Sequence, residues 1–568
     1  MNILGISCYY HDSAASLIKD GKIVAAAEEE RFSRLKHDPS FPKKSITFCL
    51  KKAKIKAEDL DYVVFYEKPF LKLERLLLNT LSYTPKSYSF FKESMRSWFF
   101  DKLWIKSHIM NELQIPSGKL LFCEHHLSHA ASSYFCSPFE KSAILVIDAV
   151  GEWTTTSWGI GKGNKIELKE EINFPQSLGL LYSAFTHFAG FEVNEGEYKV
   201  MGLAPYGKPR YVDKIQKLLD LKNDGSYALD LNYFSYHYSP QKIYTKKFTD
   251  IFGTPKTPSD EVVSYYADIA ASIQFVLEDI LVKIVNHVQQ KSGLETLCYA
   301  GGVALNSAAN WKILNKSKFK EIFIQPAAGD SGGALGAALW AYYSILNNKK
   351  DFVLNHAYWG ESESQNQIKA FLDKENIKYN FVKNEDVLIE EIVDKLSRKQ
   401  VIGWVQDEFE WGPRALGHRS ILADPSSHEM KDTVNSKIKF REGFRPFAPS
   451  VTLEESQNYF SVGSKKNHHP FKYMLYVVPV KKEKQEKLGA ITHVDGTARP
   501  QFVNKETNSR YHKLISYYGQ KTGVPVVLNT SFNLKGEPIV NTAKEAYNTF
   551  IKSGIDTLVL GKFIVNKK

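Results

Sequence analysis

The sequence predicts an α/β protein of two large domains, residues 1–350 and 351–568. Two β-hairpins of similar outline, one at the start of the chain and one near residue 150, indicate that the first domain is internally duplicated. Apolar strands run repeatedly into glycine-rich loops and then helices, a pattern typical of an α/β sheet with its ligand cleft at the strand ends. A polar bridge near residue 350, NNKKD and then GESESQNQ, marks the boundary.

The elements of the first domain follow from local patterns. The first hairpin comprises NILGISC, YYHDSAA and SLIKDGKIVAA, with a tight turn at Asp20-Gly21. The second runs from AILVIDAVGEW through TTTSWGIGKG and turns at residues 162–164 into KIELKEEI. A long amphipathic helix is expected to start near Ser259, because six apolar residues then form one stripe: Ile269, Ile273, Leu277, Leu281, Ile284 and Val288. The strands TLCYA and EIFIQP follow, each running into a glycine-containing loop ahead of a helix.

Composition restricts the function classes. With 43% hydrophobic residues the chain can build large cores, and five scattered cysteines without a CxxC pair argue against a disulfide framework or a cysteine zinc site. The N-terminus has no basic, then apolar, signal sequence, and no stretch approaches a membrane span, so we expect a cytoplasmic protein. A net charge of +11 without dense basic runs favours small phosphorylated ligands over nucleic acid.

A histidine-rich segment, CEHHLSHAASSYF, suggests a metal site. If it is helical, His125 and His129 share a face, whereas His126 points about 100° away. Asp148 and Asp330 sit at strand-end loops and could complete the ligand set, although ordinary turn or cap roles would also explain them. Two imidazoles and two carboxylates suit Fe(II), Mn(II) or Zn(II).

Small residues after two strands resemble a phosphate cradle. Gly301, Gly302 and Asn306, with Asp330 and the glycines that follow it, would let backbone N–H groups approach a nucleotide, although plain turn chemistry is the alternative. The stretch 194–209, which contains Lys199 and Gly202, has no helical or strand period and is expected to be a loop.

Basic residues of the second domain lie among glycine, proline and aromatic residues, as a pocket for a compact, multiply charged anion requires. They are Arg414, Lys439, Arg441, Arg445 and Arg499. Solvated surface arginines are the alternative. The aromatic and basic region 76–108 either selects an acceptor or forms a packing helix.

Several blocks together resemble the carbamoyltransferase family that includes nodulation protein NodU and antibiotic O-carbamoyltransferases. They span nearly the whole chain in order: HDSAA, EEERFSRLKH, HHLSHA, GEYKVMGLAPYG, AGGVALN, GDSGGALGAA, EWGPRALGHRSILADP and LNTSFN. The resemblance implies an actin/hexokinase-like N-terminal domain and a YrdC-like C-terminal domain. It places metal ligands on His125, His129, Asp148 and Asp330. It places a carbamoyl phosphate pocket on Lys439, Arg445, Arg499 and Ser531, with Arg414 nearby.

The resemblance also implies a reaction. Carbamoyl phosphate and ATP, with Mg²⁺ on the phosphates, would form a carbamoyl-adenylate in the second domain. The first domain would hold the adenylate through Lys199, Gly202, Gly301 and Gly302 and pass the carbamoyl group to a hydroxyl of a sugar, glycolipid or natural product, at a bound Fe(II) or similar metal. His11 or Asp12 is the expected base. A homodimer is compatible with this interpretation.

Two alternatives stay open at the level of sequence. A transferase of the tRNA threonylcarbamoyl type would use a similar first domain, but the chain has no RNA-binding tract. A non-catalytic nucleotide-binding protein or sugar-kinase relative would bind ATP without any dependence on carbamoyl phosphate.

Overall fold

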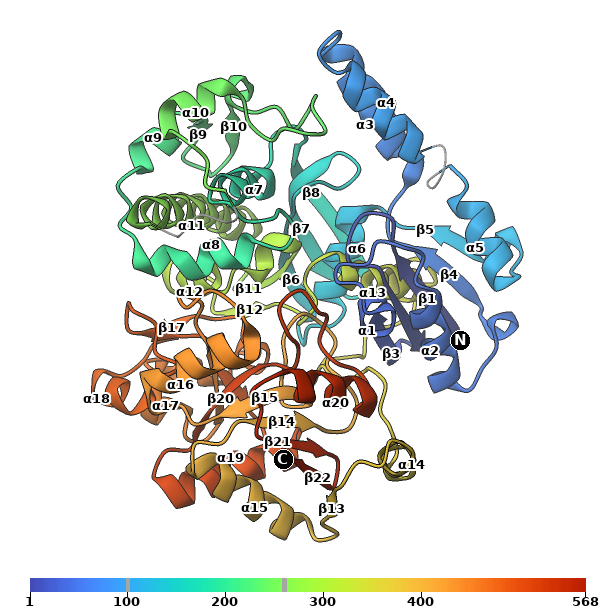
Figure 1. Ribbon diagram of the computed structural model, residues 1–568. Helices are drawn as coiled ribbons and strands as arrows, with labels where there is room; N and C mark the ends of the chain where they lie inside the picture. The colour runs from blue at the N-terminus through green and yellow to red at the C-terminus, as the bar shows by residue number, and fades with distance from the viewer. Residues whose placement is uncertain (99–102, 258–262, 568) are drawn as a thin grey trace. The chain divides into compact units, whose positions relative to one another are not determined.

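The computed structural model describes residues 1–98, 103–257 and 263–567 and divides them into two compact units (Figure 1). Unit 1 comprises residues 1–25 and 39–354, and unit 2 comprises residues 26–38 and 355–568. The main division therefore falls four residues from the expected boundary at 350. Residues 26–38, which the sequence placed in the first domain, instead group with unit 2.

Unit 1 contains two five-stranded sheets built to the same plan. Their strand orders are β3-β2-β1-β4-β5 and β8-β7-β6-β11-β12, with the hairpin strands antiparallel and the last three strands of each order parallel. The strands are β1 (Asn2–Ser7), β2 (Ala14–Lys19), β3 (Lys22–Glu28), β4 (Tyr62–Phe65), β5 (Leu120–Phe122), β6 (Lys141–Ile147), β7 (Thr154–Lys162), β8 (Lys165–Asn173), β11 (Thr296–Ala300) and β12 (Glu321–Phe323). The matching orders confirm the predicted duplication of the hairpins, whose turns lie at Asp20-Gly21 and at Gly163.

The helices of unit 1 include two that meet beside the sheets. Helix α6 packs against α13, β6 and β11, while α13 packs against β1 and β2. The helices are α2 (Lys43–Ala53), α3 (Pro69–Ser82), α4 (Tyr88–Ser97), α5 (Ile105–Leu113), α6 (His125–Tyr134), α7 (Leu178–Phe188), α8 (Glu197–Leu203), α9 (Val212–Gln216), α10 (Lys246–Phe252), α11 (Ser264–Ser292), α12 (Ser307–Lys316) and α13 (Asp330–Trp340). A small hairpin joins β9 (Leu219–Leu221) to β10 (Tyr227–Leu229).

Glycine explains how α13 approaches its neighbours. A side chain at Gly336 would collide with the backbone of Ser128 on α6, and one at Gly5 on β1 would collide with the backbone of Ala334. The motif GDSGGALGAA is therefore partly a packing motif, since small residues let two helices and a strand come into backbone contact. This packing brings the start of α13 next to α6.

Helix α11 confirms the predicted apolar stripe. All six residues of the stripe are buried, with Ile269 fully inaccessible and Ile284 6% exposed. The helix is described from Ser264, and the predicted start near Ser259 lies outside the described residues. The stretch 194–209 is not simply a loop as predicted, because α8 forms at Glu197–Leu203 and buries Val200 and Leu203. Tertiary packing against α11 overrides the weak local pattern.

Unit 2 is built on an eight-stranded mixed sheet of order β13-β22-β21-β14-β15-β20-β16-β19. Its strands are β13 (Asn380–Phe381), β14 (Ile402–Val405), β15 (Arg419–Ala423), β16 (Ala448–Thr452), β19 (Gln501–Val503), β20 (Val526–Ser531), β21 (Thr557–Leu560) and β22 (Phe563–Asn566). A separate ribbon pairs β17 (Val478–Pro479) with β18 (Thr497–Ala498). The mixed α/β class predicted from the sequence is confirmed for both units.

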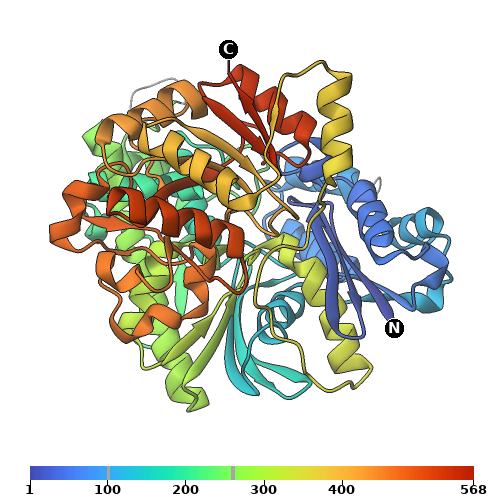
Figure 2. The same cartoon turned by 90° about the horizontal axis from the view of Figure 1, so that it is seen from below.

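Helices cover both faces of the large sheet in unit 2. Helices α15 and α19 lie side by side on one face and bury Leu388, Ile392 and Leu514 in the core, whereas α16 and α20 lie on the other (Figures 1 and 2). The helices are α1 (Glu30–Ser33), α14 (Gln365–Lys374), α15 (Glu385–Ser397), α16 (His428–Thr433), α17 (Ser456–Tyr459), α18 (Lys482–Gln485), α19 (Ser509–Thr522) and α20 (Ala543–Lys552).

Buried polar contacts hold residues 26–38 in unit 2. The Glu28 carboxylate accepts a hydrogen bond of 2.8 Å from Gly412 N, and Arg31 donates one of 2.7 Å to Gly412 O. Arg34 donates to the carbonyl oxygens of Pro538 and Ile539. Because Glu28 and Arg31 are almost fully buried, these bonds are protected from water and fix the segment firmly.

None of the helices in the described ranges combines the length and the apolar character needed to cross a lipid bilayer.

Candidate active site

Four side chains of unit 1 converge on one buried point. His125 Nε2 lies 3.0 Å from Asp148 Oδ2 and 3.1 Å from His129 Nε2, and His129 Nε2 lies 3.2 Å from the same Asp148 oxygen. Asp330 Oδ1 lies 3.7 Å from His125 Nε2 and 3.4 Å from His129 Nε2. All four residues are buried, with exposures of 7% or less. We call these residues the His/Asp cluster.

The local fold explains this convergence. The two histidines stand one turn apart on α6, which begins at His125, and the Glu152 carboxylate accepts from His125 N at this end of the helix. Asp148 directly follows β6, and its Oδ1 accepts from Ala149 N and Gly302 N. Asp330 is the first residue of α13, the helix that packs against α6. A strand end and two helix ends thus bring the four predicted ligand residues together.

Opposite charges within the cluster shift the pKa values of its side chains. Burial alone would raise the pKa of Asp148, but hydrogen bonds and charge from His125 and His129 hold it well below its usual range. Burial would likewise lower the pKa of His129, but Asp148 and Asp330 outweigh burial and raise that pKa to about 9. In the cation-free protein, a proton on His129 therefore balances part of the carboxylate charge.

The donor set fits a divalent cation. The four ligand atoms all lie within 4.8 Å of one another. Ligands bound at 2.0–2.2 Å to one ion stand roughly 3 to 3.6 Å apart, which is close to the separations found here. Among the described residues no group lies within hydrogen-bond distance of the buried Asp330 Oδ2, so this oxygen has coordination capacity to spare. Two nitrogen and two oxygen donors suit iron, manganese or zinc.

The remaining histidines of the region have separate positions. His126 points away from the cluster, as predicted, and its Nδ1 lies 2.8 Å from Ser157 Oγ on β7. His11 lies at the edge of the cluster, with Nε2 3.9 Å from Asp330 Oδ2 and Nδ1 2.9 Å from Asp12 Oδ2. Burial would lower the pKa of His11, but the carboxylates of Asp330 and Asp12 prevail and raise it to about 10.

The predicted nucleotide residues gather next to the cluster. Gly301 adopts a φ of 92°, and a side chain there would collide with the backbone of Ile147, so only glycine fits. The backbone N–H of Gly302 donates to Asp148, which ties this loop to the cluster. Asn306 caps α12 by accepting from Ala309 N. Its structural role is therefore that of a helix cap.

Lys199 and Gly202 lie on α8, both half-buried. The neighbouring Met201 accepts a long hydrogen bond from Ser307 Oγ on α12, which places α8 beside the loop at 301–306. Lys199 packs its ammonium group over the Phe191 ring at 5.8 Å. The structure thus brings this pair close to the glycine loop.

The basic residues of unit 2 also converge. Burial lowers the pKa of the Arg499 guanidinium well below its ordinary value, and three neighbouring guanidinium groups lower it further. These groups belong to Arg414, Arg441 and Arg445. Lys439 is 4% exposed, and its pKa is likewise held well below the usual value by burial and then by the charges of Arg441 and Arg445. We call these five residues the basic cluster.

Ser531 lies next to Lys439 of the basic cluster. The Lys439 ammonium donates to Ser531 O at 2.8 Å, to Ser531 Oγ at 3.2 Å and to Asn533 Oδ1 at 2.6 Å. Asn533 is a residue that the sequence did not single out, although it lies in the same LNTSFN block. Glu152, whose carboxylate accepts a hydrogen bond from the start of α6, was also missed. Its position four residues after Asp148, in the loop that follows β6, was the available signal.

Comparison with known proteins agrees with this arrangement. The model of the carbamoyltransferase N-terminus matches residues 2–339, and that of the carbamoyltransferase C-terminus matches residues 393–567. An uncharacterized protein of Synechocystis sp. is 46% identical over 100% of this chain and 97% of its own length. Nodulation protein NolNO of Sinorhizobium fredii is 37% identical over 99% of this chain and 79% of its own length.

A third relative carries the name of an enzyme. The 3'-hydroxymethylcephem-O-carbamoyltransferase of Amycolatopsis lactamdurans is 26% identical over 97% of this chain and 96% of its own length. The resemblance inferred from the sequence blocks is therefore confirmed, as is the predicted enzyme class. With both family models matched in order along one chain, this protein belongs to the carbamoyltransferase family.

Proposed function

We propose that the protein is an ATP-dependent O-carbamoyltransferase, which forms a carbamoyl-adenylate from carbamoyl phosphate and ATP and transfers the carbamoyl group to a hydroxyl. The observation that carries this proposal is the basic cluster of unit 2. Three arginines of this cluster lie near enough to Arg499 to lower its pKa, and two of them also lower the pKa of Lys439. Such a cluster favours a compact anion with several charges, which carbamoyl phosphate provides.

Carbamoyl phosphate would be bound by Ser531 and by four residues of the basic cluster, Arg414, Lys439, Arg445 and Arg499. Guanidinium groups bind phosphate oxygens bidentately, while the Lys439 ammonium is held in place by Ser531 and Asn533. With one water consumed, carbamoyl phosphate and ATP give carbamoyl-adenylate, phosphate and pyrophosphate. Mg²⁺ would accompany the ATP phosphates. This assignment treats unit 2 as the YrdC-like domain that the sequence resemblance implies.

Unit 1 would hold the adenylate and transfer the carbamoyl group. Its duplicated sheets support the proposed actin/hexokinase-like class, in which ligands bind at the strand ends. Gly301 and Gly302, which have no side chains, would let the phosphate lie close to this loop, with Lys199 and Gly202 on the adjoining α8. Asn306 would support this loop from its cap position.

The His/Asp cluster would hold Fe(II) or a similar divalent metal through His125, His129, Asp148 and Asp330. When bound, such a cation would act as a Lewis acid toward the carbamoyl carbonyl. Asp148 also accepts from Gly302 N, so the residue that would bind the cation orients the glycine loop as well. Metal site and nucleotide loop are thereby kept in a fixed relation.

His11 is the better placed of the two candidate bases, and Asp12 acts through it. His11 Nε2 faces Asp330, while Asp12 holds the opposite ring nitrogen at 2.9 Å. With a pKa raised to about 10 by the surrounding carboxylates, His11 keeps its proton at neutral pH. It can accept the proton of the acceptor hydroxyl only after the charge of Asp330 has been compensated.

The acceptor would be a hydroxyl-bearing sugar, glycolipid or natural product. A cytoplasmic location and a homodimer stay predictions from the sequence.

Variants can separate the two half-reactions. Arg499→Ala should abolish pyrophosphate release but leave transfer from pre-formed carbamoyl-adenylate intact. His129→Ala should do the reverse. The measurement uses labelled carbamoyl phosphate and ATP, with pyrophosphate and carbamoylated product determined separately. The proposal fails if wild-type protein releases no pyrophosphate that depends on both substrates.

A further inference from the structure

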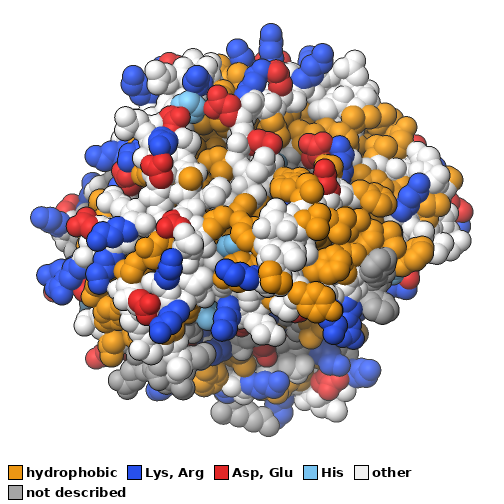
Figure 3. Space-filling view, turned by 90° about the horizontal axis from the view of Figure 1, so that it is seen from above, with side chains coloured by type: hydrophobic (Ala, Val, Ile, Leu, Met, Phe, Trp, Pro, Cys, Tyr) orange, Lys and Arg blue, Asp and Glu red, His pale blue; other side chains and the backbone are white. Residues whose placement is uncertain are grey.

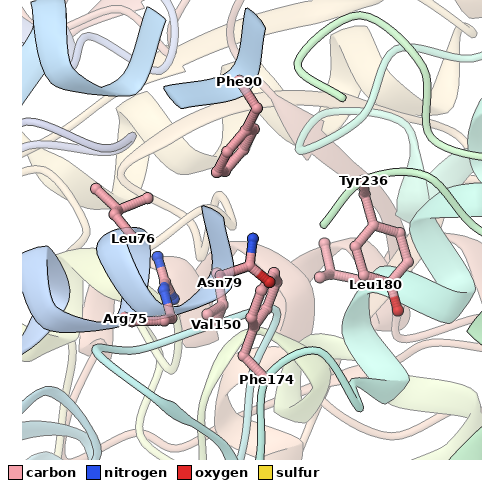
Figure 4. A pocket seen from close by; sticks show the side chains of 8 residues that line it. All are labelled: Arg75, Leu76, Asn79, Phe90, Val150, Phe174, Leu180 and Tyr236. Carbon is pink, nitrogen blue, oxygen red and sulfur yellow. The ribbon is translucent and has the colours of Figure 1, made fainter. Parts of the chain in front are cut away.

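An apolar cavity opens beneath the α3–α4 hairpin of unit 1 (Figure 4). Leu76 and Phe90 face it from the two helices, and Val150, Phe174, Leu180 and Tyr236 line the other sides, with Arg75 and Asn79 at its edge. Its volume is about 160 Å³. An apolar cavity of about 150 Å³ accommodates one benzene ring, so there is room here for a group of that size.

The cavity adjoins the His/Asp cluster. Val150 is two residues beyond Asp148, so their Cα atoms are at most about 7 Å apart. Arg75 Nη1 donates to Gly151 O at 2.8 Å. A side chain at Gly151 would lie 3.0 Å from the His125 ring, so the loop that borders the cavity also touches the cluster. A single loop, which contains Val150 and Gly151, therefore separates the cavity from the cluster.

The polar groups at the edge of the cavity are already engaged with the protein. The Arg75 guanidinium, besides its bond to Gly151, lies 5.0 Å from the centroid of the Phe174 ring. The Asn79 amide nitrogen donates to His237 O. Burial lowers the pKa of Arg75 to about 10, which indicates that its charge is poorly solvated. These contacts make the site suited to an uncharged, apolar group.

We infer that this cavity receives an apolar, ring-sized group of the acceptor. The acceptor is thus a hydroxyl compound that carries an aromatic or short aliphatic substituent, with its hydroxyl directed toward the His/Asp cluster. The identification of the bound molecule as the acceptor rests on the proposed function. Binding of the apolar group to the cavity does not depend on catalysis and can be measured separately.

The exposed face of α3 offers a matched control. Large apolar side chains point into solvent on this hairpin, including Leu77, Leu78 and Leu81, and hydrophobic side chains are abundant on the face of the molecule shown in Figure 3. Leu81 is 71% exposed, whereas Leu76 lines the cavity from the same helix. Leu76→Trp should fill the cavity, while Leu81→Trp adds the same ring at the surface.

The experiment measures binding of phenyl glucoside and of glucose to the full-length protein without ATP, by ligand-observed NMR titration. Wild-type protein and Leu81→Trp should bind phenyl glucoside at least about ten-fold more tightly than glucose. Leu76→Trp should lose that preference. Leu180→Trp, which fills the cavity from α7, tests the same point if Leu76→Trp does not fold, as judged by circular dichroism.

Two results would overturn the inference. One is equal affinity for the two probes, or no binding of phenyl glucoside, in wild-type protein. The other is an undiminished preference in a folded cavity-filling variant. Failure of the proposed function would look different, because pyrophosphate release would be missing while the binding preference and its loss in Leu76→Trp would persist.

Discussion

Proton binding to the His/Asp cluster should make the stability of the cation-free protein depend on pH. His129 is inaccessible to solvent, and Asp148 and Asp330 overcome the effect of burial to raise its pKa from 6.5 to about 9. A group whose pKa is raised on folding stabilises the folded state fully below its unfolded pKa. This contribution disappears as pH rises through the folded pKa.

The magnitude follows from the two pKa values. A tenfold difference in proton affinity is worth about 1.4 kcal/mol, so the interval from 6.5 to about 9 corresponds to about 3 kcal/mol at low pH. Between about pH 7.5 and about pH 9.5, about 2 kcal/mol of this stabilisation should be lost. His126 does not contribute in this range. Burial lowers its pKa well below 6.5, and neither folded nor unfolded protein protonates it above about pH 7.5.

The assay is urea unfolding of chelator-treated protein across this pH range, followed by circular dichroism. Wild-type protein should lose about 2 kcal/mol more than His129→Gln, whereas His126→Gln should behave as wild type. Added divalent cation should oppose the loss, because ligands bind a metal in their deprotonated form and the cation competes with the proton. Identical pH dependence in wild-type protein and His129→Gln would refute this account of the charges in the cluster.

Two substitutions test the other predicted sites. Arg499→Met should raise the thermal stability of the anion-free protein, because it relieves repulsion among the neighbouring guanidinium groups. It should also weaken carbamoyl phosphate binding about 10- to 100-fold in calorimetric titration, since a charge-assisted hydrogen bond is worth about 1.5–3 kcal/mol. Substitution of the exposed Arg398 by Met should change neither the stability nor the binding. The prediction would be contradicted if Arg499→Met lowered both the thermal stability and the affinity for carbamoyl phosphate. Gly301→Ala should cost about 1–3 kcal/mol and abolish ATP binding because its side chain would meet the Ile147 backbone. Gly293 also has a positive φ, but a side chain there would point into open space, so Gly293→Ala should lower the free energy of unfolding by only about 1 kcal/mol and leave ATP binding intact. Equal effects of the two substitutions would refute the role of the loop.

Local signals explain which parts of the fold could be predicted. The turn at Asp20-Gly21 requires positive φ at both residues, and this requirement is visible in the sequence. Helix α8 could not be predicted, because its seven residues include Gly202 and become ordered only where Val200 and Leu203 bury against other elements. The assignment of residues 26–38 to unit 2 depends on contacts of Glu28 and Arg31 with Gly412, nearly 400 residues away, which no local pattern reports.

The same distinction applies to the sites. His125 and His129 are one turn apart on a helix, so their shared face follows from spacing alone. Asp148 and Asp330 could be predicted because strand-end loops of one fold collect in one cleft. The contact between Lys439 and Asn533 joins residues 94 positions apart and depends on how the loop after β20 folds. The α3–α4 cavity was likewise beyond prediction, since its lining comes from five separate stretches of chain.

Isotope exchange between ATP and pyrophosphate tests the formation of a carbamoyl-adenylate most directly. Reversible adenylation should return labelled pyrophosphate into ATP only when carbamoyl phosphate is present, and Arg499→Ala should abolish the exchange. Exchange that proceeds equally well without carbamoyl phosphate, or no exchange under conditions in which the protein carbamoylates an acceptor, would contradict the proposed chemistry.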